Sequence, residues 1–255
     1  MISHYRLSRL MREQAFPVYR NDSITLTQTG IGKTAMAAGV AYTYAIFAGT
    51  KSRVWLNVGV AGHPQFTIGQ ALLAHKITDQ DRDKSWYPPL ITEPPCPTET
   101  LLTRSRPETG YGQETLYDME GSGFYETASR FSSSELVQCF KIVSDNRSNP
   151  ADSFGAEQVA ALIAGRLDLI DILIAQMKAL AVAPESQVID FVDRFTRRWR
   201  FSHQQSLHLK SLLHRLVLLD PKKCPRPEQL AKLKNARAVL TYLEDIVVHL
   251  PIAFP

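Results

Sequence analysis

The stretch from residue 116 to residue 145 constrains the fold of this chain more than any other. Asp118, near its start, is a residue type that favours a helix N-cap, and apolar residues follow it at helical spacing. Residues 136–143 form an apolar run of strand length that stops at Ser144 and Asp145. The pattern predicts a helix that begins with a carboxylate, followed by a buried strand that ends in another. Because ligands bind at the carboxyl ends of strands in open α/β sheets, we expect the site at this edge.

Two segments that contain glycine precede this stretch, and the first lies at residues 30–34. Residues 23–29 alternate in polarity, which predicts a half-buried strand. The segment Gly-Ile-Gly-Lys-Thr then leads into a helix expected over residues 35–48, where small side chains allow close packing on a sheet. The Gly-Lys-Thr triplet also suggests a loop that binds nucleoside triphosphates, but Thr27 stands where that motif requires its first glycine.

The second glycine segment, Gly-Val-Ala-Gly at residues 59–62, closes a strand predicted over residues 53–58. Paired glycines at the end of a strand permit a tight turn and bring backbone N–H groups close to a ligand. Residues 68–74 follow as a further, largely apolar segment. From residue 78 to residue 99 the sequence is charged and rich in proline. We expect an irregular loop there that either covers the mouth of a pocket or lies on the surface.

Taken in order, these segments resemble the nucleoside phosphorylase and methylthioadenosine/adenosylhomocysteine nucleosidase superfamily. The resemblance is based on the two glycine segments, on Asp-Met-Glu at residues 118–120 and on Ser-Asp at residues 144–145, and it covers about residues 23–180. It implies a three-layer αβα fold with a mixed sheet, a small nucleoside as ligand and a homodimer. The resemblance implies no metal and no resident cofactor, and phosphate is a co-substrate only if the enzyme is a phosphorylase. A cytoplasmic location is expected from the three cysteines, which are odd in number and far apart.

The resemblance also implies roles for individual residues in purine nucleoside cleavage. Breaking the C1′–N9 bond leaves an electron-poor ribose and a base that departs poorly as an anion, so these enzymes protonate the purine and hold the sugar. By position, Asp145 is the general acid and Ser144 supports it. Glu120 binds the 2′- and 3′-hydroxyls, and Met119 lines the sugar. Proton donation near neutral pH requires a raised pKa for Asp145, which a largely apolar pocket provides. The remaining candidates are the substrate or phosphate segments, Gly30, Gly32, Gly59, Val60, Ala61 and Gly62, and a base contact, Tyr111.

The chain departs from the family pattern on the side of the nucleophile. Val60 stands where many members have serine or threonine, and Asn57 where phosphorylases have arginine. The family's first strand and its water-activating glutamate are missing. Residues 1–16 instead predict a short basic helix, on which Glu13 is expected to be a solvated charge. We therefore expect hydrolysis rather than phosphorolysis. The alternative is a catalytically silent nucleoside-binding module whose tail contacts a partner.

The missing strand also bears on the start of the chain. A strand lost from the middle of a sheet leaves unpaired backbone groups, each of which costs about 1–3 kcal/mol when buried. Either residues 1–22 rearrange to cover the gap, or Met1 lies downstream of the natural start. We expect the second.

The basic excess of the chain lies at its carboxyl end. The net charge of +4 divides into 17 Lys/Arg against 18 Asp/Glu before residue 185, and 12 against 7 from there on. We expect an α/β domain at residues 1–183, closed by one long helix over residues 155–180, and a basic extension of three helices at residues 184–255. The densest basic run of the extension comprises Arg194, Arg197, Arg198 and Arg200. These arginines either form a solvated face or contact nucleic acid or an acidic partner.

Other features of the sequence limit the class of protein. Three widely separated cysteines fit a reducing compartment and argue against a disulfide framework. No apolar run approaches the length of a membrane-spanning helix. The apolar stripes of the extension are expected to pack on the α/β domain or on a second subunit.

Overall fold

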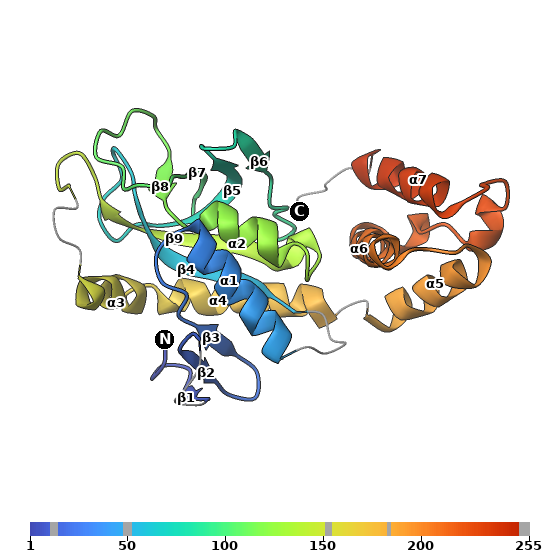
Figure 1. Ribbon diagram of the computed structural model, residues 1–255, viewed down its shortest axis with the longest axis horizontal. Coiled ribbons are helices and arrows are strands. Elements are labelled where there is room, and N and C mark those ends of the chain that lie inside the picture. Colours follow the sequence, from blue (N-terminus) through green and yellow to red (C-terminus); the bar gives the residue numbers. More distant parts are fainter. Residues whose placement is uncertain (11–14, 48–52, 151–154, 183–184, 250–255) are drawn as a thin grey trace.

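The computed structural model describes residues 1–10, 15–47, 53–150, 155–182 and 185–249. Its centre is a six-stranded mixed sheet with the strand order β6-β5-β7-β8-β4-β9 (Figure 1). The strands are β4 (Trp55–Gly62), β5 (Ala71–Asp79), β6 (Lys84–Trp86), β7 (Thr98–Thr103), β8 (Leu116–Asp118) and β9 (Val137–Asp145). The first residues of β5 also pair with β9 in antiparallel register. As a result β5, β7, β8, β4 and β9 close into a ring.

Helices cover both faces of the sheet (Figure 1). The helices are α1 (Lys33–Ile46) and α2 (Gly121–Ala128), which pack together on one face, and α3 (Ala156–Ala164) and α4 (Leu167–Val182), which cover the other. Successive side chains of β9 point to opposite faces of the sheet, so this strand contributes to the hydrophobic core on each face. Cys139 and Val143 join the core under α1 and α2, whereas Phe140 and Ile142 join the core under α4. The predicted three-layer αβα fold with a mixed sheet is confirmed.

The amino-terminal part differs from its prediction. The expected basic helix over residues 1–16 is wrong: the described residues 1–10 form turns and the short strand β1 (Ser8–Arg9), and Glu13 lies outside the described residues. Tyr5 explains this local structure, because its hydroxyl donates to Asp171 of α4 at 2.7 Å and ties the turn to the sheet's outer layer. The predicted strand over residues 23–29 is found, but in a separate antiparallel sheet. That sheet contains β1, β2 (Val18–Arg20) and β3 (Thr25–Thr27).

Two predicted loop or helix segments also need correction. The expected irregular loop over residues 78–99 begins as the end of β5 and returns as β6, which pairs with β5 in antiparallel register. The expected long helix over residues 155–180 is broken between α3 and α4 at Gly165 and Arg166. There the guanidinium of Arg166 donates to the carbonyls of Gly69 at 2.7 Å and Gly165 at 2.8 Å. The first of these bonds ties the break between α3 and α4 to the segment that precedes β5.

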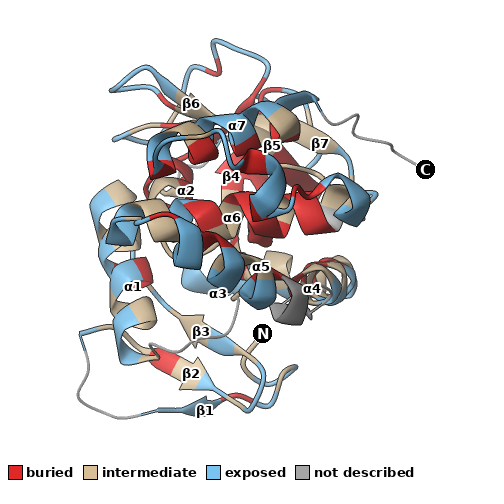
Figure 2. Cartoon of the chain, turned by 90° about the vertical axis from the view of Figure 1, so that its right-hand side faces the viewer, coloured by how far each residue is buried: buried red, intermediate tan, exposed pale blue. Residues whose placement is uncertain are grey.

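The carboxyl-terminal helices build a hydrophobic core of their own (Figure 2). The elements are α5 (Glu185–Arg198), α6 (His203–Leu219), α7 (Ala236–His249) and two 3₁₀ turns, η2 (Pro221–Lys223) and η3 (Pro227–Leu230). The side chain of Ser202 caps α6 by accepting from the backbone of Gln205 at 3.3 Å. This helical unit extends the molecule along its longest axis (Figure 1).

A buried hydrogen bond joins the helical unit to the α/β part. His214 Nδ1 of α6 lies 2.6 Å from Glu135 Oε1, and both side chains are almost fully buried. The division expected at residues 183 and 184 stays a prediction, since both residues lie outside the described part of the chain. No described helix has both the length and the apolar composition needed to cross a membrane.

Candidate functional site

The candidate site is built where three strands meet at Gly62. This last residue of β4 pairs with Tyr117 of β8 on one side and with Asp145 of β9 on the other. Because neighbouring strand backbones lie about 4.8 Å apart, the backbones of Tyr117 and Asp145 are about 10 Å apart, with Gly62 between them. The register shifts here: Ala61 pairs with Val143 but Gly62 pairs with Asp145, so β9 contains one extra residue. Such a bulge bends the strand and re-aims the side chains beside it.

Asp145 is a buried carboxylate that is held by two hydroxyl groups. Ser144 Oγ donates to its Oδ1 at 2.5 Å, and the Tyr111 hydroxyl donates to its Oδ2. The residue is only 8% exposed. A Cβ atom at Gly62 would overlap Asp145 Oδ2, so only glycine fits at this point of the ladder. The structure thus brings four predicted residues together: Asp145, Ser144, Tyr111 and Gly62.

Tyr111 is positioned by a short loop that is tied at both ends. Its backbone has φ = 47°, a left-handed conformation that is costly for a bulky residue. Glu108 Oε1 accepts from the Tyr111 backbone N–H at 3.0 Å, and Arg147 Nη2 donates to the Tyr111 carbonyl at 2.6 Å. Burial, together with the bond to Asp145, raises the pKa of Tyr111, so the phenol stays protonated and remains a donor.

Glu120 lies beside the first glycine segment. Its Oε1 accepts from the backbone N–H of Gly32 at 2.7 Å. Gly30 and Gly32 both have positive φ angles, of 83° and 98°, which explains the need for glycine at these two positions. The Oε2 atom of Glu120 forms no hydrogen bond with any described residue of the chain. Met119 is half-buried and precedes it in the link between β8 and α2.

Asp118 is not the helix N-cap that the sequence suggested. It is the last residue of β8, and α2 begins three residues later at Gly121. Its Oδ2 still accepts from the Gly121 backbone N–H at 2.7 Å, and its Oδ1 accepts from Thr103 at 2.7 Å. The Asp118 side chain therefore holds the first residue of α2 against the end of β8.

A buried lysine beneath the site was missed by sequence reasoning. Lys141 Nζ lies 2.8 Å from Asp118 Oδ2 and 3.2 Å from Asn57 Oδ1, and the residue is 1% exposed. Burial alone would lower the pKa of Lys141, but the charges of Asp118 and Glu120 raise it, so the ammonium persists. The signal was present in the sequence, because a single lysine interrupts the apolar run of β9. A buried ammonium at such a position needs a carboxylate partner, which here comes from another strand.

The residues of the second glycine segment lie inside a strand. The turn predicted at residues 59–62 is wrong, because each of these residues pairs with β9, from Gly59 opposite Lys141 to Gly62 opposite Asp145. Val60 and Ala61 are thus ladder residues, and the segment forms no loop around a ligand. A Cβ at Gly59 would lie 3.3 Å from Lys141 Nζ, so this glycine leaves room for the buried ammonium.

His63 and Lys33, two polar residues beside the glycine segments, have structural partners. His63 Nδ1 accepts from the backbone N–H groups of Gln65 and Phe66, both at 3.1 Å, and burial lowers the pKa of the ring. Lys33 Nζ lies 3.0 Å from Asp79 and 2.5 Å from Asp81. Because two carboxylates hold Lys33, the segment lacks the free lysine that a triphosphate-binding loop requires.

Two aromatic residues, Trp86 and Tyr87, lie in the segment that was expected to cover a pocket mouth or the surface. Trp86 ends β6, and its ring lies 6.5 Å from that of Tyr125 in α2. Tyr87 is 67% exposed and follows on the surface. Within the described ranges, no group of three or more His, Cys, Asp or Glu side chains is arranged to hold a metal ion.

Comparison with solved structures identifies the fold. A 5′-methylthioadenosine/S-adenosylhomocysteine nucleosidase from Helicobacter pylori matches with 13% identity and a TM-score of 0.53, over 69% of this chain and 91% of its own. The corresponding nucleosidase from Neisseria meningitidis, in complex with methylthio-immucillin-A, matches with 16% identity and a TM-score of 0.51, over 66% and 93%.

A third match is the 5′-methylthioadenosine nucleosidase of Arabidopsis thaliana in its apo form, with 14% identity and a TM-score of 0.51, over 69% of this chain and 89% of that one. No family model and no curated protein matches the sequence. At these identities the likeness shows the fold alone. The chain has the nucleoside-phosphorylase-like fold that the resemblance implied, in a divergent form.

Proposed function

We propose that this chain cleaves the N-glycosidic bond of a purine nucleoside, or of its 5′-thio derivative, by hydrolysis. The proposal rests on two carboxylates, Asp145 at the end of β9 and Glu120 in the link between β8 and α2. Asp145 is buried and bonded to hydroxyl groups, whereas Glu120 is fixed on the Gly32 amide. We assign proton transfer to the first carboxylate and the binding of a polar ligand to the second.

Asp145 is proposed to protonate the departing base. Ser144 holds Oδ1, which leaves Oδ2 as the oxygen that meets the purine once the Tyr111 hydroxyl moves away. A proton delivered to N7 of the purine lets the base leave as a neutral molecule, and general acids of this kind contribute about 10²–10⁴-fold to the rate. Ser144 and the bulge fix the carboxylate for this transfer.

Glu120 is proposed to hold the ribose. Gly32 occupies Oε1, so Oε2 is left to accept hydrogen bonds from the 2′- and 3′-hydroxyls. Lys141 is the nearby cation that offsets the charge of the two carboxylates, Asp118 and Glu120. An ionised Glu120 accepts hydrogen bonds without donating, as binding to two hydroxyls requires.

Hydrolysis is favoured over phosphorolysis by the surroundings of Lys141. This ammonium is already bonded to Asp118 and Asn57, so it is not free to bind a phosphate ion. Val60 and Ala61 lie within the β4 ladder, where their backbone groups face β9. Water, the nucleophile in hydrolysis, is neutral and does not need a cation to bind it.

Incubation with inosine, adenosine and methylthioadenosine, each with and without phosphate, tests the proposal. We expect free base from at least one nucleoside at a rate that phosphate does not change. Phosphate-dependent release would convert the assignment to phosphorolysis. No release from any nucleoside by a folded preparation contradicts the proposal.

A second candidate function is a catalytically silent nucleoside-binding module. The specific observation in its favour is the Tyr111 hydroxyl, which occupies Asp145 Oδ2 and competes with the base for the acid. Calorimetry with adenine and adenosine separates the two functions. The silent module binds without turnover, whereas turnover that is lost in Asp145→Asn excludes it.

Three further proposals rest on the sequence alone. They are the homodimer, the cytoplasmic location and the division between residues 183 and 184. Light scattering at micromolar concentration tests the first of these. A mass of twice 28.6 kDa is expected, and a monomeric mass contradicts the dimer.

A further inference from the structure

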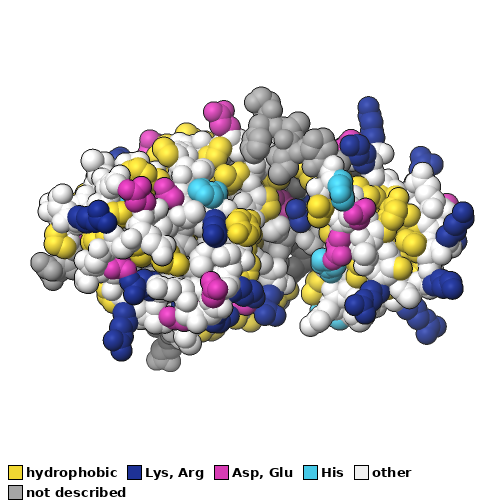
Figure 3. Space-filling view, turned by 90° about the horizontal axis from the view of Figure 1, so that it is seen from above, with side chains coloured by type: hydrophobic (Ala, Val, Ile, Leu, Met, Phe, Trp, Pro, Cys, Tyr) yellow, Lys and Arg dark blue, Asp and Glu magenta, His cyan; other side chains and the backbone are white. Residues whose placement is uncertain are grey.

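The end of the helical unit that lies farthest from the α/β part carries a dense positive charge. Between residues 197 and 237, a range that includes this end of the unit, the sequence contains eleven Lys/Arg and only two Asp/Glu. Viewed from above, this end of the molecule is fringed with Lys and Arg side chains (Figure 3). The α/β part, by contrast, has nearly balanced charges.

Packing within the helical unit brings cations from separate segments together. Trp199 Nε1 at the end of α5 donates to the Leu233 carbonyl at 2.9 Å, which places the end of α5 against the turn that precedes α7. We call the exposed cations of these two segments the distal basic surface, namely Arg197, Arg198, Arg200, Lys232, Lys234 and Arg237.

The cations of the distal basic surface are not neutralised within the molecule. None of them forms an ion pair with a carboxylate of the described residues. Arg194, which belongs to the same run in the sequence, differs because its guanidinium lies 2.7 Å from Asp190 one helical turn away. Arg198 lies over the Trp199 ring, 5.5 Å from its centroid, and therefore stays near the surface with its charge free.

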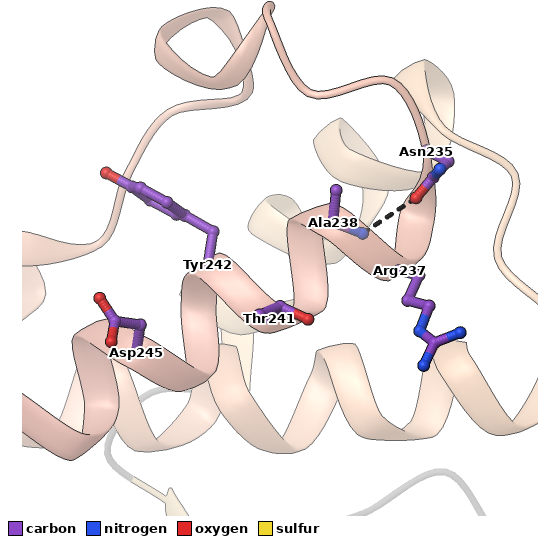
Figure 4. A pocket seen from close by; sticks show the side chains of 6 residues that line it. All are labelled: Asn235, Arg237, Ala238, Thr241, Tyr242 and Asp245. Atoms are coloured by element: carbon purple, nitrogen blue, oxygen red, sulfur yellow. Dashed lines mark hydrogen bonds between the residues drawn. The ribbon is translucent and has the colours of Figure 1, made fainter.

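An open groove begins beside this surface and runs along α7. It has a volume of about 550 Å³ and is lined by Asn235, Arg237, Ala238, Thr241, Tyr242 and Asp245. The side chain of Asn235 is used within the groove, since it accepts from the Ala238 backbone N–H at 3.0 Å (Figure 4). The Tyr242 ring projects from the helix and is 42% exposed. Cations at one end and an aromatic face along the groove thus lie on one continuous stretch of surface.

We propose that the distal basic surface and the α7 groove bind single-stranded nucleic acid. A polymer with one phosphate per nucleotide matches the row of unpaired cations, and an unpaired base can stack on Tyr242. A duplex offers the phosphates but keeps its bases stacked on one another, so it does not use Tyr242. An acidic peptide offers charge without a planar base. The proposal is independent of the nucleosidase activity, because it concerns the opposite end of the molecule and is measured by binding.

Fluorescence anisotropy of the full chain with a labelled 16-nucleotide oligothymidylate tests the proposal. We expect binding that weakens between 50 and 200 mM salt, with a logarithmic slope of about −0.7 per neutralised phosphate. The triple variant Lys232→Gln, Lys234→Gln, Arg237→Gln should reduce this slope by about 2. Arg194→Gln is the matched control, because that cation is already paired, and it should leave the slope unchanged.

Tyr242→Ala tests the stacking contact. We expect its affinity for the oligonucleotide to fall about 5-fold or more, since stacking of one base on an aromatic ring contributes at least that much. Tyr87→Ala, at an exposed tyrosine of the α/β part, should have no effect. Circular dichroism of every variant distinguishes a loss of binding from a loss of folding.

Three results would overturn the proposal. One is the absence of oligonucleotide binding at 50 mM salt by the folded chain. Another is equal affinity for a 16-base-pair duplex together with no effect of Tyr242→Ala. The last is a stronger response to polyglutamate competition, or to vesicles with phosphatidylserine, than to an unlabelled oligonucleotide. Such a response would assign the surface to a different polyanion.

Discussion

The hydroxyl of Tyr111 donates a hydrogen bond to the carboxylate of Asp145, although 34 residues separate them in the chain. The contact closes the candidate site, because the oxygen that would meet a base is already bonded. It depends on a loop held by Glu108 and Arg147 and on a left-handed backbone at Tyr111. In the proposed reaction, a nucleoside must displace this hydroxyl before it reaches Asp145.

Tyr111→Phe removes the hydroxyl and keeps the ring. The net contribution of a hydrogen bond is about 0.5–1.5 kcal/mol, so removing it in advance should raise kcat/KM for the nucleoside by up to about 10-fold. Steady-state kinetics measures the change. Tyr117→Phe is the matched control, since its hydroxyl bonds to the backbone of Gln113 and not to Asp145. A variant slower than the wild type would mean that the hydroxyl assists the reaction instead of closing the site.

Gly62→Ala tests the close approach of β4 to Asp145. The new Cβ would overlap Asp145 Oδ2 and lie 3.1 Å from the Tyr111 ring, so the carboxylate must shift. We expect lost activity and a free energy of unfolding lower by about 1–3 kcal/mol, the usual cost of overpacking. Gly112→Ala has no atom within 4 Å of its new Cβ and should be tolerated. Urea unfolding of both variants measures the difference, and equal stability would contradict the predicted overlap.

Lys141→Met tests the buried pair beneath the site. It leaves the Asp118 carboxylate buried without its cation, which typically costs about 3–5 kcal/mol of the free energy of unfolding. Lys84→Met is the control, because Lys84 is half exposed and pairs with Glu126 on the surface, where a pair contributes about 0–1 kcal/mol. Chemical denaturation compares the two. A similar small loss in both variants would show that Lys141 is not needed to compensate Asp118.

Asp79 gives the folded protein a defined sensitivity to acid. Burial opposes its ionisation, yet hydrogen bonds from Lys33, Arg82 and Ser122 hold the pKa of Asp79 below its usual value. A carboxyl group whose pKa is lower in the folded state stabilises fully above its unfolded pKa, which is about 3.9, and loses this contribution as the pH falls through the folded value. We therefore expect stability to decline as the pH falls below about 4.

Asp79→Asn should flatten this acid limb of the stability curve and lower stability near neutral pH. Asp83→Asn is the matched control: Asp83 is exposed, and its φ of 48° is a conformation that asparagine tolerates. Thermal melts between pH 3 and pH 7 provide the comparison. An unchanged pH profile in Asp79→Asn would contradict the assigned role.

The elements that the sequence predicted well are those whose pattern is local. The mainly apolar run at residues 136–143 forms β9, which ends at Asp145, because a fully buried strand is rich in apolar residues. The helix after Gly32 begins at Lys33 because two glycines supply the positive φ angles that turn the chain into it. Both features depend on neighbouring residues alone.

The features that the sequence missed depend on partners far away in the chain. Residues 59–62 contain glycines typical of a turn, yet pairing with β9 keeps them extended. The Lys141–Asp118 pair needs two strands brought together through β4. Tyr111 was a candidate for contact with the base, but its bond to Asp145 follows from a loop conformation that no local pattern encodes. Residues 1–10 were predicted to be helical, but they form turns and a short strand. The hydrogen bond from Tyr5 to Asp171 of α4 fixes these turns.

The central claim, hydrolytic cleavage with Asp145 as the acid, is tested most directly by running the reaction in water enriched in ¹⁸O with phosphate present. Mass spectrometry then identifies both products. The account predicts free purine base and a pentose that carries one ¹⁸O atom, with both products absent in Asp145→Asn. Unlabelled pentose 1-phosphate, or products that form equally fast in Asp145→Asn, would contradict it.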